Sequence, residues 1–375
     1  MKEKKKILLV TGIYPLFKGG AEYQMRLIAD QLSEQYEVVY VYLGDIPGRS
    51  VESTRLEIVD GYKVYFIKTC GRIDGLLLKR SYAEELYKVV RKERPDYVYQ
   101  RVLKFMSYYL AKYQAKLGYR HIIHIADVFT LEFKRKSLRD KINFYFFQAT
   151  VKYQPHFVVQ TGEQSTLLRK LGVAPSLQLY NMHPKEEIDV LSVASHKINN
   201  TPKHIVWVAN IKPIKQLEVF VDLAVKFVDV SEFHFTVVGD IQDSSYASEI
   251  VKRMAALSNI THYKDKDNSF VNRYILEKAS LVVNTSKSEG FSNVFIQSWL
   301  RGVPVLSLNS NPDLLFDKYP DFGICANDSD NLGEELEKIL DRNTYVTRAE
   351  NCYNVSRQLF SFDNVNRLKR LLEEI

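Results

Sequence analysis

Residues 286–308 of the sequence bring together side chains that suit the binding of a sugar and a phosphate. An apolar run that ends at Asn284 predicts a buried strand, and either Ser292 or Asn293 can cap the helix that follows the loop. Glu289 would then lie directly before the N-terminus of this helix, where a carboxylate can accept hydrogen bonds from sugar hydroxyls. The free backbone amides of the first helical turn can bind a phosphate at the same place.

Asn293 and Gln297 are four residues apart, so they share one face of the predicted helix and both can hydrogen-bond a polyhydroxyl ligand. Together with Glu289, this segment resembles the signature of the group 1 glycosyltransferases, which form family 4 among the enzymes with the GT-B fold. In that family a Glu, seven residues and a second Glu bracket the donor site. Glu289 occupies the first of these positions, and Gln297 occupies the second.

The resemblance implies that Glu289 contacts the donor sugar at the catalytic centre and that Gln297 contacts the ribose of the nucleotide. An amide keeps one acceptor and adds two donors, so ribose binding remains feasible with Gln. The residues that follow Glu289 are assigned to donor binding as well: Gly290, Phe291, Ser292 and Asn293. The alternative for this segment is an ordinary strand, loop and capped helix without a ligand.

A second segment, residues 206–216, is similar to the family's strand end in which a basic residue and a Lys bind the donor diphosphate. The resemblance places that Lys at Lys215. Many members have Gly-Arg where this chain has Ala-Asn, so Asn210 replaces the basic residue and Lys212 would supply part of the missing charge. The alternative is a loop with solvated lysines.

Three glycines extend the predicted donor site. Gly239 follows the apolar run 233–238 and resembles the glycine that lets the backbone approach the nucleotide base. Gly19 and Gly20 join the first predicted strand to the first helix, where glycine can adopt backbone angles that other residues avoid and can let a ligand approach the helix N-terminus. The family has a Gly-Gly pair here, near the donor phosphates and the acceptor, although a loop hinge is the alternative.

Asp127 lies just beyond the predicted strand 121–125. The family often places a His or an Asp near the reacting centre at this strand end, so Asp127 is the second candidate catalytic residue. His124 is a weaker candidate, because a His within a strand is more often structural.

Residues 133–147 are first basic and then aromatic. Such a pattern suits a segment that docks on a membrane surface or holds a lipid-linked acceptor. A surface turn leading into a core helix is the alternative.

The rest of the chain predicts the elements that position these residues. Short apolar runs alternate with helical patterns, which indicates parallel sheets covered by helices on both faces. Strands are expected at 7–10, 38–42, 97–100, 121–125, 157–160, 204–208, 233–238, 281–284 and 303–308. Helices are expected at 21–32, 73–91, 104–116, 161–171, 216–227, 246–256, 270–278, 293–301, 331–340 and 363–374. The predicted class is α/β with two doubly wound, Rossmann-like domains facing a central cleft, which is the GT-B arrangement; such domains bind ligands at the carboxyl ends of the strands.

The predicted domain order has four parts. An N-terminal, acceptor-side domain comprises residues 1–183, and residues 184–201 form a linker because they contain no sustained apolar run. A nucleotide-sugar-binding domain follows at 202–360, and a C-terminal helix at 361–375 is expected to pack back on the first domain.

Composition narrows the class of protein. A length of 375 residues fits two α/β domains, and the formal net charge of +7 suits anionic ligands. The three cysteines, Cys70, Cys325 and Cys352, have no metal-ligand spacing, so we expect no metal and no cofactor. No apolar stretch is long enough for a signal peptide or a membrane span. A cytoplasmic protein is expected, with peripheral contact at the inner face of the cell membrane as an option.

The resemblance implies a retaining, metal-independent transfer of a sugar from a nucleotide-sugar, with UDP expected, to a glycan or a lipid-linked saccharide in polysaccharide biosynthesis. Three alternatives remain. One is another GT-B enzyme, such as a sugar-nucleotide epimerase. Another is a catalytically inactive relative that binds a glycan or a partner, suggested by Gln297 and Asn210. The least favoured is a nucleic-acid binder, suggested only by the net charge and 24 tyrosines; we expect no nucleic-acid partner.

Overall fold

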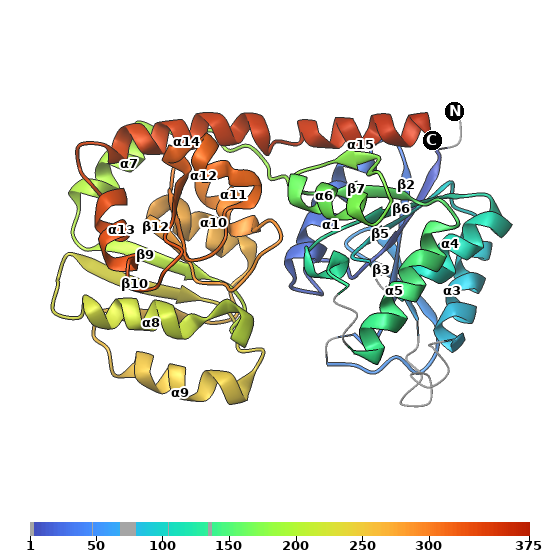
Figure 1. Ribbon diagram of the computed structural model, residues 1–375, viewed down its shortest axis with the longest axis horizontal. Helices are drawn as coiled ribbons and strands as arrows, with labels where there is room; N and C mark the ends of the chain where they lie inside the picture. The colour runs from blue at the N-terminus through green and yellow to red at the C-terminus, as the bar shows by residue number, and fades with distance from the viewer. Residues whose placement is uncertain (1–3, 47, 68–79, 104, 134–136) are drawn as a thin grey trace. The chain divides into compact units, whose positions relative to one another are not determined.

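The computed structural model describes residues 4–46, 48–67, 80–103, 105–133 and 137–375. Part of the helix predicted at 73–91, Lys104 and the basic residues 134–136 therefore lie outside the described residues, as does Cys70. The chain forms two compact units (Figure 1). Unit 1 comprises Met1–Met182 and Phe362–Ile375, and unit 2 comprises His183–Ser361.

Unit 1 contains a sheet of eight strands in the order β3-β4-β2-β1-β5-β6-β7-β8, parallel except for the β3–β4 pair. The strands are β1 Lys6–Val10, β2 Glu37–Leu43, β3 Arg55–Val59, β4 Tyr62–Ile67, β5 Tyr97–Arg101, β6 Arg120–His124, β7 His156–Val159 and β8 Leu177–Gln178. The helices are α1 Gly20–Leu32, α3 Arg80–Glu93, α4 Met106–Leu117, η1 Phe129–Leu131, α5 Leu138–Val151, α6 Gly162–Lys170 and α15 Asp363–Glu374.

Both faces of this sheet are buried, which explains why its central strands are continuous apolar runs. Successive side chains of a strand point to opposite faces. Ile7 and Leu9 of β1 accordingly pack in one cluster with α1 and α15, whereas Leu8 and Val10 pack in another with α3 and α4. Helix α15 contacts α1, and Leu368 is fully buried in the first cluster.

Unit 2 contains a fully parallel sheet of six strands in the order β11-β10-β9-β12-β13-β14. The strands are β9 Lys203–Val208, β10 Phe233–Val238, β11 Ile260–Tyr263, β12 Ala279–Asn284, β13 Val305–Ser307 and β14 Gly323–Cys325. The helices are α7 Val190–Asn199, η2 Pro213–Lys215, α8 Leu217–Lys226, α9 Ser244–Ala255, α10 Asn268–Glu277, α11 Asn293–Trp299, η3 Pro312–Leu314, α12 Leu315–Lys318, η4 Pro320–Phe322, α13 Leu332–Ile339, α14 Tyr345–Leu359.

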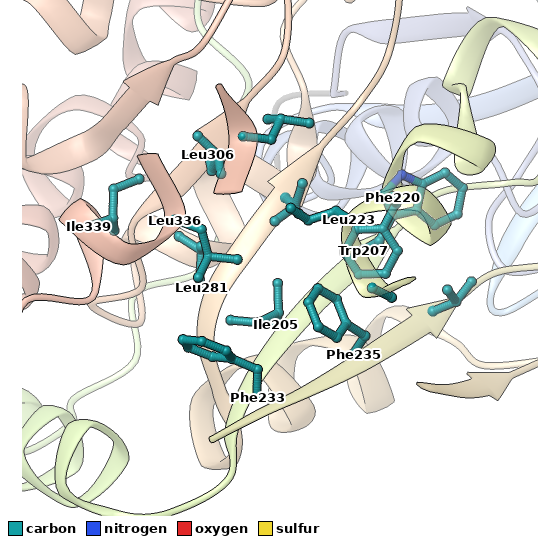
Figure 2. Packing of buried hydrophobic residues seen from close by; sticks show 14 of the residues in the cluster. Ile205, Trp207, Phe220, Leu223, Phe233, Phe235, Leu281, Leu306, Leu336 and Ile339 are labelled. Atoms are coloured by element: carbon teal, nitrogen blue, oxygen red, sulfur yellow. The ribbon is translucent and has the colours of Figure 1, made fainter. Parts of the chain in front are cut away.

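The main hydrophobic cluster of unit 2 contains residues of the sheet and of helices α7, α8, α9, α13 and α14, and Figure 2 shows part of it. Figure 2 shows Trp207 of β9 beside Phe220 of α8 and Phe235 of β10, all of which are buried. On the other side of the core, Leu306 and Leu336 join the same cluster. The predicted α/β class with doubly wound parallel sheets is confirmed.

The segment 184–201 differs from the predicted linker. Residues Val190–Asn199 form α7, which packs against α14 within unit 2. The helix begins after Asp189, whose side chain accepts a hydrogen bond from the amide of Ser192, and it buries Val190, Ala194 and Ile198. These three apolar residues are four positions apart, so they lie on one face of the helix. The polar residues between them make this helical pattern hard to see in the sequence.

The burial of α15 in unit 1 yields a stability prediction. Leu368→Ala removes a buried side chain and should lower the free energy of unfolding by about 2–5 kcal/mol. Arg370→Ala, on the exposed side of the same helix, is the control and should change it by less than about 0.5 kcal/mol. Denaturant unfolding followed by circular dichroism measures both. Equal midpoints for the two variants would contradict the packing of α15.

Candidate functional site

The candidate site in unit 2 lies at the carboxyl ends of β9 and β12. The chain leaves β9 for β10 on one side, and β12 later pairs with β9 on its other side. The strand order therefore reverses between β9 and β12, which is the position at which doubly wound sheets generally bind ligands. The loop after β9 carries Lys215, and the loop after β12 carries Glu289.

Lys215 and Glu289 meet across this point. The Lys215 Nζ donates to Glu289 Oε1 at 2.5 Å, and the side chains are only 19% and 13% exposed. Ser286 and Asn284 also donate to Oε1, at 2.7 and 3.1 Å. Among the described residues no hydrogen bond to the other oxygen, Oε2, is found, so that oxygen is available to a ligand.

The environment of Glu289 keeps it ionised. Burial alone would raise its pKa, but the positive charge of Lys215 and the hydrogen bonds from Lys215, Ser286 and Asn284 lower the pKa below its ordinary value. A carboxylate in this state can only accept hydrogen bonds, which suits the hydroxyls of a sugar.

A buried hydrogen-bond chain fixes the two loops relative to each other. The indole of Trp207 donates to Thr285 Oγ1 at 3.0 Å, and Thr285 Oγ1 donates to the backbone carbonyl of Lys215 at 2.8 Å. The amide of Lys287 also donates to the carbonyl of Ile214 at 2.9 Å. Thr285 is fully buried, so its hydroxyl is satisfied on both sides by protein. Sequence reasoning missed Thr285, although a polar residue directly after a buried strand was a usable signal.

Gln297 is held by neighbouring helix α10. Its Nε2 donates to Asn268 and Asn272, at 3.1 and 2.7 Å, and the residue is 1% exposed. The two donors that an amide adds are therefore used within the protein, and only Oε1 is left for a nucleotide.

The remaining residues of the predicted donor segment have mixed surroundings. Phe291 is buried against Trp299 and Phe360, so its side chain belongs to the core of unit 2. Ser292 occupies the N-cap position of α11 without a side-chain cap hydrogen bond, and Asn293 is the first residue of that helix. Gly290, like Asn293, is half-buried.

Asn210 and Lys212 belong to the same loop as Lys215, the one that follows β9, and both are half-buried. Gly239, at the end of β10, is explained by packing: a Cβ there would lie 1.8 Å from the carbonyl oxygen of Ala209. The glycine thus permits the adjacent ends of β9 and β10 to approach closely.

In unit 1 the special backbone angles expected at Gly19 and Gly20 are not observed. Gly19 has φ −126°, and neither Gly19 nor Gly20 has a positive φ. A Cβ at Gly19 would lie 2.0 Å from the Oε2 of Glu22, but this atom ends a flexible side chain that can move aside, so packing does not require the glycine. The Glu22 carboxylate therefore lies over the N-terminus of α1.

Asp127 and His124 have structural partners. Asp127 Oδ1 accepts from the amide of Thr130 at 2.8 Å, which stabilises the turn at η1. His124 is 1% exposed, and its Nδ1 lies 2.6 Å from the hydroxyl of Tyr99. Burial and then the charge of Arg101 lower the pKa of His124 well below its ordinary value, so the ring is neutral.

A pocket of about 760 Å³ opens in unit 1 at the carboxyl ends of β1, β2 and β5. The order of strands reverses between β1 and β5, as it does between β9 and β12 in unit 2. Glu22, Gln100 and Arg101 line the pocket, whereas His124 and Asp127 do not. Sequence reasoning did not single out these three residues. Arg101 directly follows a predicted strand, which was the available signal.

The comparisons with known proteins give a family match for part of the chain and a fold for the whole of it. Residues 202–342, all within unit 2, match the family model described as glycosyl transferases group 1. No curated protein matches the chain.

Solved structures resemble the whole chain at low identity. Sucrose-phosphate synthase from Thermosynechococcus elongatus has a TM-score of 0.77 at 15% identity, over 99% of both chains. HepE of Anabaena, solved with UDP-glucose, has a TM-score of 0.73 at 14% identity, over 99% of this chain and 100% of HepE. Trehalose-6-phosphate synthase OtsA has a TM-score of 0.72 at 9% identity, over 99% of both chains. The fold of this chain is therefore GT-B.

The Lys215–Glu289 pair predicts how stability depends on pH. The pKa of Glu289 is lower in the folded state than its ordinary value of 4.5, so its stabilising effect is complete above that value and is lost as the pH falls through the lower, folded pKa. Glu289→Gln should therefore unfold more easily than the unchanged protein near neutral pH, and this difference should shrink in acid. Urea unfolding at several pH values measures it. A difference that stays constant or grows toward acid pH would show that Glu289 is not stabilised as an anion.

Proposed function

From the match of residues 202–342 to the group 1 glycosyltransferases and from the GT-B fold, we propose that this chain is a glycosyltransferase that transfers a sugar from a UDP-sugar to a saccharide acceptor. The observation that carries the proposal is the Lys215–Glu289 pair at the switch point of the sheet in the matched domain. The choice of UDP is supported by HepE, which was solved with UDP-glucose.

The two members of the pair have different roles in this proposal. Lys215 binds the diphosphate and stabilises the negative charge that develops when the bond to the sugar breaks. Glu289 accepts a sugar hydroxyl through Oε2, while Oε1 keeps its three protein partners. The chain from Trp207 through Thr285 holds Lys215 in place before the donor binds, so less ordering is needed on binding.

Further donor contacts are proposed for the rest of the site. Lys212 and Asn210 would lie along the diphosphate, and Gln297 would accept a ribose hydroxyl through Oε1. The backbone at Gly239 and at residues 290–293 would border the nucleotide and the sugar. Gly19 and Gly20 in unit 1 would approach the donor phosphates. Asp127 is proposed to act near the acceptor, as the family resemblance suggests. Retention of configuration, independence of a metal and a place in polysaccharide biosynthesis rest on that resemblance alone.

A test of the donor site is the release of UDP from a panel of UDP-sugars. Lys215→Met should lower kcat by about 10²–10³ because it removes the charge that stabilises the leaving group. Glu289→Gln should also lower kcat, because the amide replaces a full negative charge. Lys287→Met removes an exposed charge two residues before Glu289 and should leave kcat unchanged. Full activity in Lys215→Met, or no binding of any UDP-sugar to the unchanged protein, would overturn the proposed site.

The surroundings of Gln297 favour one second candidate, a relative that binds the nucleotide-sugar without turnover. Both Nε2 hydrogen bonds of Gln297 go to α10, which leaves the ribose fewer contacts than the family's Glu would give it. Binding of a UDP-sugar by calorimetry, combined with no UDP release in the presence of any acceptor, would favour this candidate over the enzyme.

Contact with a membrane surface is proposed for helix α5. Leu138, Ile142 and Tyr145 recur on one face of this helix and are 75%, 37% and 65% exposed, and Lys141 beside them is exposed. Within the described residues, no helix has the length and apolar character that a membrane-crossing segment needs. The proposal is therefore contact with the surface of an anionic membrane, which would also retain the protein at the cytoplasmic face.

Vesicle sedimentation tests this contact. The unchanged protein should bind vesicles that contain anionic phosphatidylglycerol more than vesicles of phosphatidylcholine. The triple variant Leu138→Ser, Ile142→Ser and Tyr145→Ser should lose about tenfold or more in binding, because the buried apolar area supplies the attraction. UDP binding should be unchanged in the triple variant, and this measurement is the control for folding. Equal sedimentation of the variant and the unchanged protein would exclude α5 as the contact.

A further inference from the structure

Strand β3 is the last strand at one edge of the sheet in unit 1. Among the described residues, no other strand pairs with the outer side of β3. We infer that this edge is a dimer interface, at which β3 pairs in antiparallel fashion with β3 of a second copy of the chain. The inference goes beyond the proposed function and does not depend on it.

The geometry of the β3–β4 hairpin determines which backbone groups of β3 point outward. The two strands are joined by a two-residue turn, 60–61, in which both residues have a positive φ, and Val59 is opposite Tyr62. In such a hairpin the pair that closes the turn is hydrogen-bonded, and hydrogen-bonded pairs then alternate with non-hydrogen-bonded pairs. Every second residue, counted back from Val59, therefore bonds to β4. The amides and carbonyls of Leu56 and Ile58 face outward, where a further strand can pair with them.

The side chains of β3 do not protect this edge. Soluble proteins usually protect a sheet edge with Lys, Pro or a β-bulge. β3 contains neither Lys nor Pro, and its register with β4 is continuous from Arg55 to Val59. It exposes two apolar side chains instead, Leu56 at 44% and Ile58 at 67%. Pairing with a further strand would remove part of this apolar surface from water.

Leu56 and Ile58 lie on the face of the sheet that α3 covers. Leu56 is opposite Tyr65 of β4, which packs in the cluster with α3 and α4. Thr54, two residues before Leu56, donates to Glu85 of α3 at 2.8 Å. A two-fold axis perpendicular to the sheet keeps equivalent faces on the same side, so the α3 helices of the two copies would flank the exposed apolar side chains.

The charges of β3 favour a second copy of the chain as the partner. Arg55 and Glu57 lie on the other face of the strand, and each side chain is 31% exposed. When Leu56 is opposite Leu56 of the second copy, Arg55 is opposite Glu57 of that copy and Glu57 is opposite its Arg55. These are the non-hydrogen-bonded positions, where side chains are closest, and opposite charges there attract.

The same charges disfavour the neighbouring register. A shift that places Leu56 opposite Ile58 of the second copy also aligns the outward backbone groups, but it brings Glu57 opposite Glu57. Like charges directly opposite each other are destabilising. The residues of β3 alone thus select one register, and the resulting contact is symmetric, as a closed dimer requires.

The proposed pairing leaves the pocket of unit 1 outside the interface. Strands β1, β2 and β4 are parallel to one another, and the antiparallel pairing of β3 reverses their direction in the second copy. The carboxyl ends of these strands would therefore lie at opposite edges of the joint sheet in the two copies. Loss of the dimer should accordingly leave ligand binding by each copy unchanged.

Sedimentation velocity of the full-length protein over a series of concentrations tests the interface. The unchanged protein should shift from monomer to dimer as the concentration rises. Leu56→Lys places two like charges opposite each other at the centre of the interface and should weaken association by about tenfold or more. Val225→Lys is the matched control, because Val225 of α8 in unit 2 is also 44% exposed, and it should leave association unchanged.

Two further variants test the register. Arg55→Glu would place Glu opposite Glu in its own dimer, and Glu57→Arg would place Arg opposite Arg. Each variant alone should therefore associate about tenfold or more weakly than the unchanged protein. An equimolar mixture of the two should regain association, because each charge then meets its opposite across the axis. Such recovery also shows that both variants are folded.

Each outcome decides the inference. A monomer at every concentration of the unchanged protein would overturn it, and a dimer that Leu56→Lys does not weaken would place the interface elsewhere. A mixture of the two charge variants that stays monomeric would contradict the antiparallel register. Binding of UDP-glucose is measured in parallel: if the unchanged protein dimerises but binds no UDP-glucose, the interface stands and the proposed donor site does not.

Discussion

The ion pair between Lys215 and Glu289 depends on a constraint that the parallel sheet imposes. The two residues are 74 positions apart in the chain, and they meet because β9 and β12 are neighbours whose carboxyl ends lie at the same edge. Both charges of such a pair lose their hydration when they are buried. The pair therefore stabilises the fold only if its geometry is fixed. The fixed hydrogen bonds of Thr285 with Trp207 and Lys215 supply that geometry. The core around Trp207 thus determines the position of a charge that lies at its margin.

The two units differ in the partners that surround a buried charged side chain. In unit 2 the Glu289 carboxylate is met by a cation and two neutral donors, so the site is electrostatically balanced before a ligand arrives. In unit 1 the Arg101 guanidinium is held by an amide oxygen and lies beside a neutral His124. The Lys215 ammonium has two further N–H donors, so it can bind a diphosphate while it keeps its hydrogen bond to Glu289. The Glu22 carboxylate lines the same pocket and its charge acts on Arg101, although no ion pair between these two described residues is found.

Much of this organisation was predictable from the sequence, because buried parallel strands are short apolar runs. The strands at 38–42 and 233–238 and the helix at 363–374 lie within or coincide with observed elements. The hairpin of β3 and β4 was missed because Arg55–Val59 alternates charged and apolar residues at the edge of the sheet. Helix α14 was missed because its sequence is largely polar and its buried residues become visible only against α7.

Some residues of the candidate site could be identified from the sequence, whereas those whose role depends on tertiary contacts could not. Glu289 was singled out from its place before a helix N-terminus and Lys215 from the family resemblance, and the structure places their side chains in contact. The role of Thr285 could not be inferred, because it depends on two loops that only the folded sheet brings together. Arg101 is equally hidden, since a charged residue after a strand is common and only burial without a carboxylate distinguishes it.

The return of α15 to unit 1 has a consequence for the order in which the chain can fold during synthesis. Unit 2 is complete in the sequence at Ser361, before α15 has been made. Domains generally fold as units as the nascent chain emerges. Unit 1 begins first, yet its core lacks Leu368, Leu371 and Leu372 until α15 has left the ribosome, after all of unit 2. Unit 1 thus acquires its complete core only after unit 2 has been synthesised, and until then the apolar side chains that α15 covers are exposed to water.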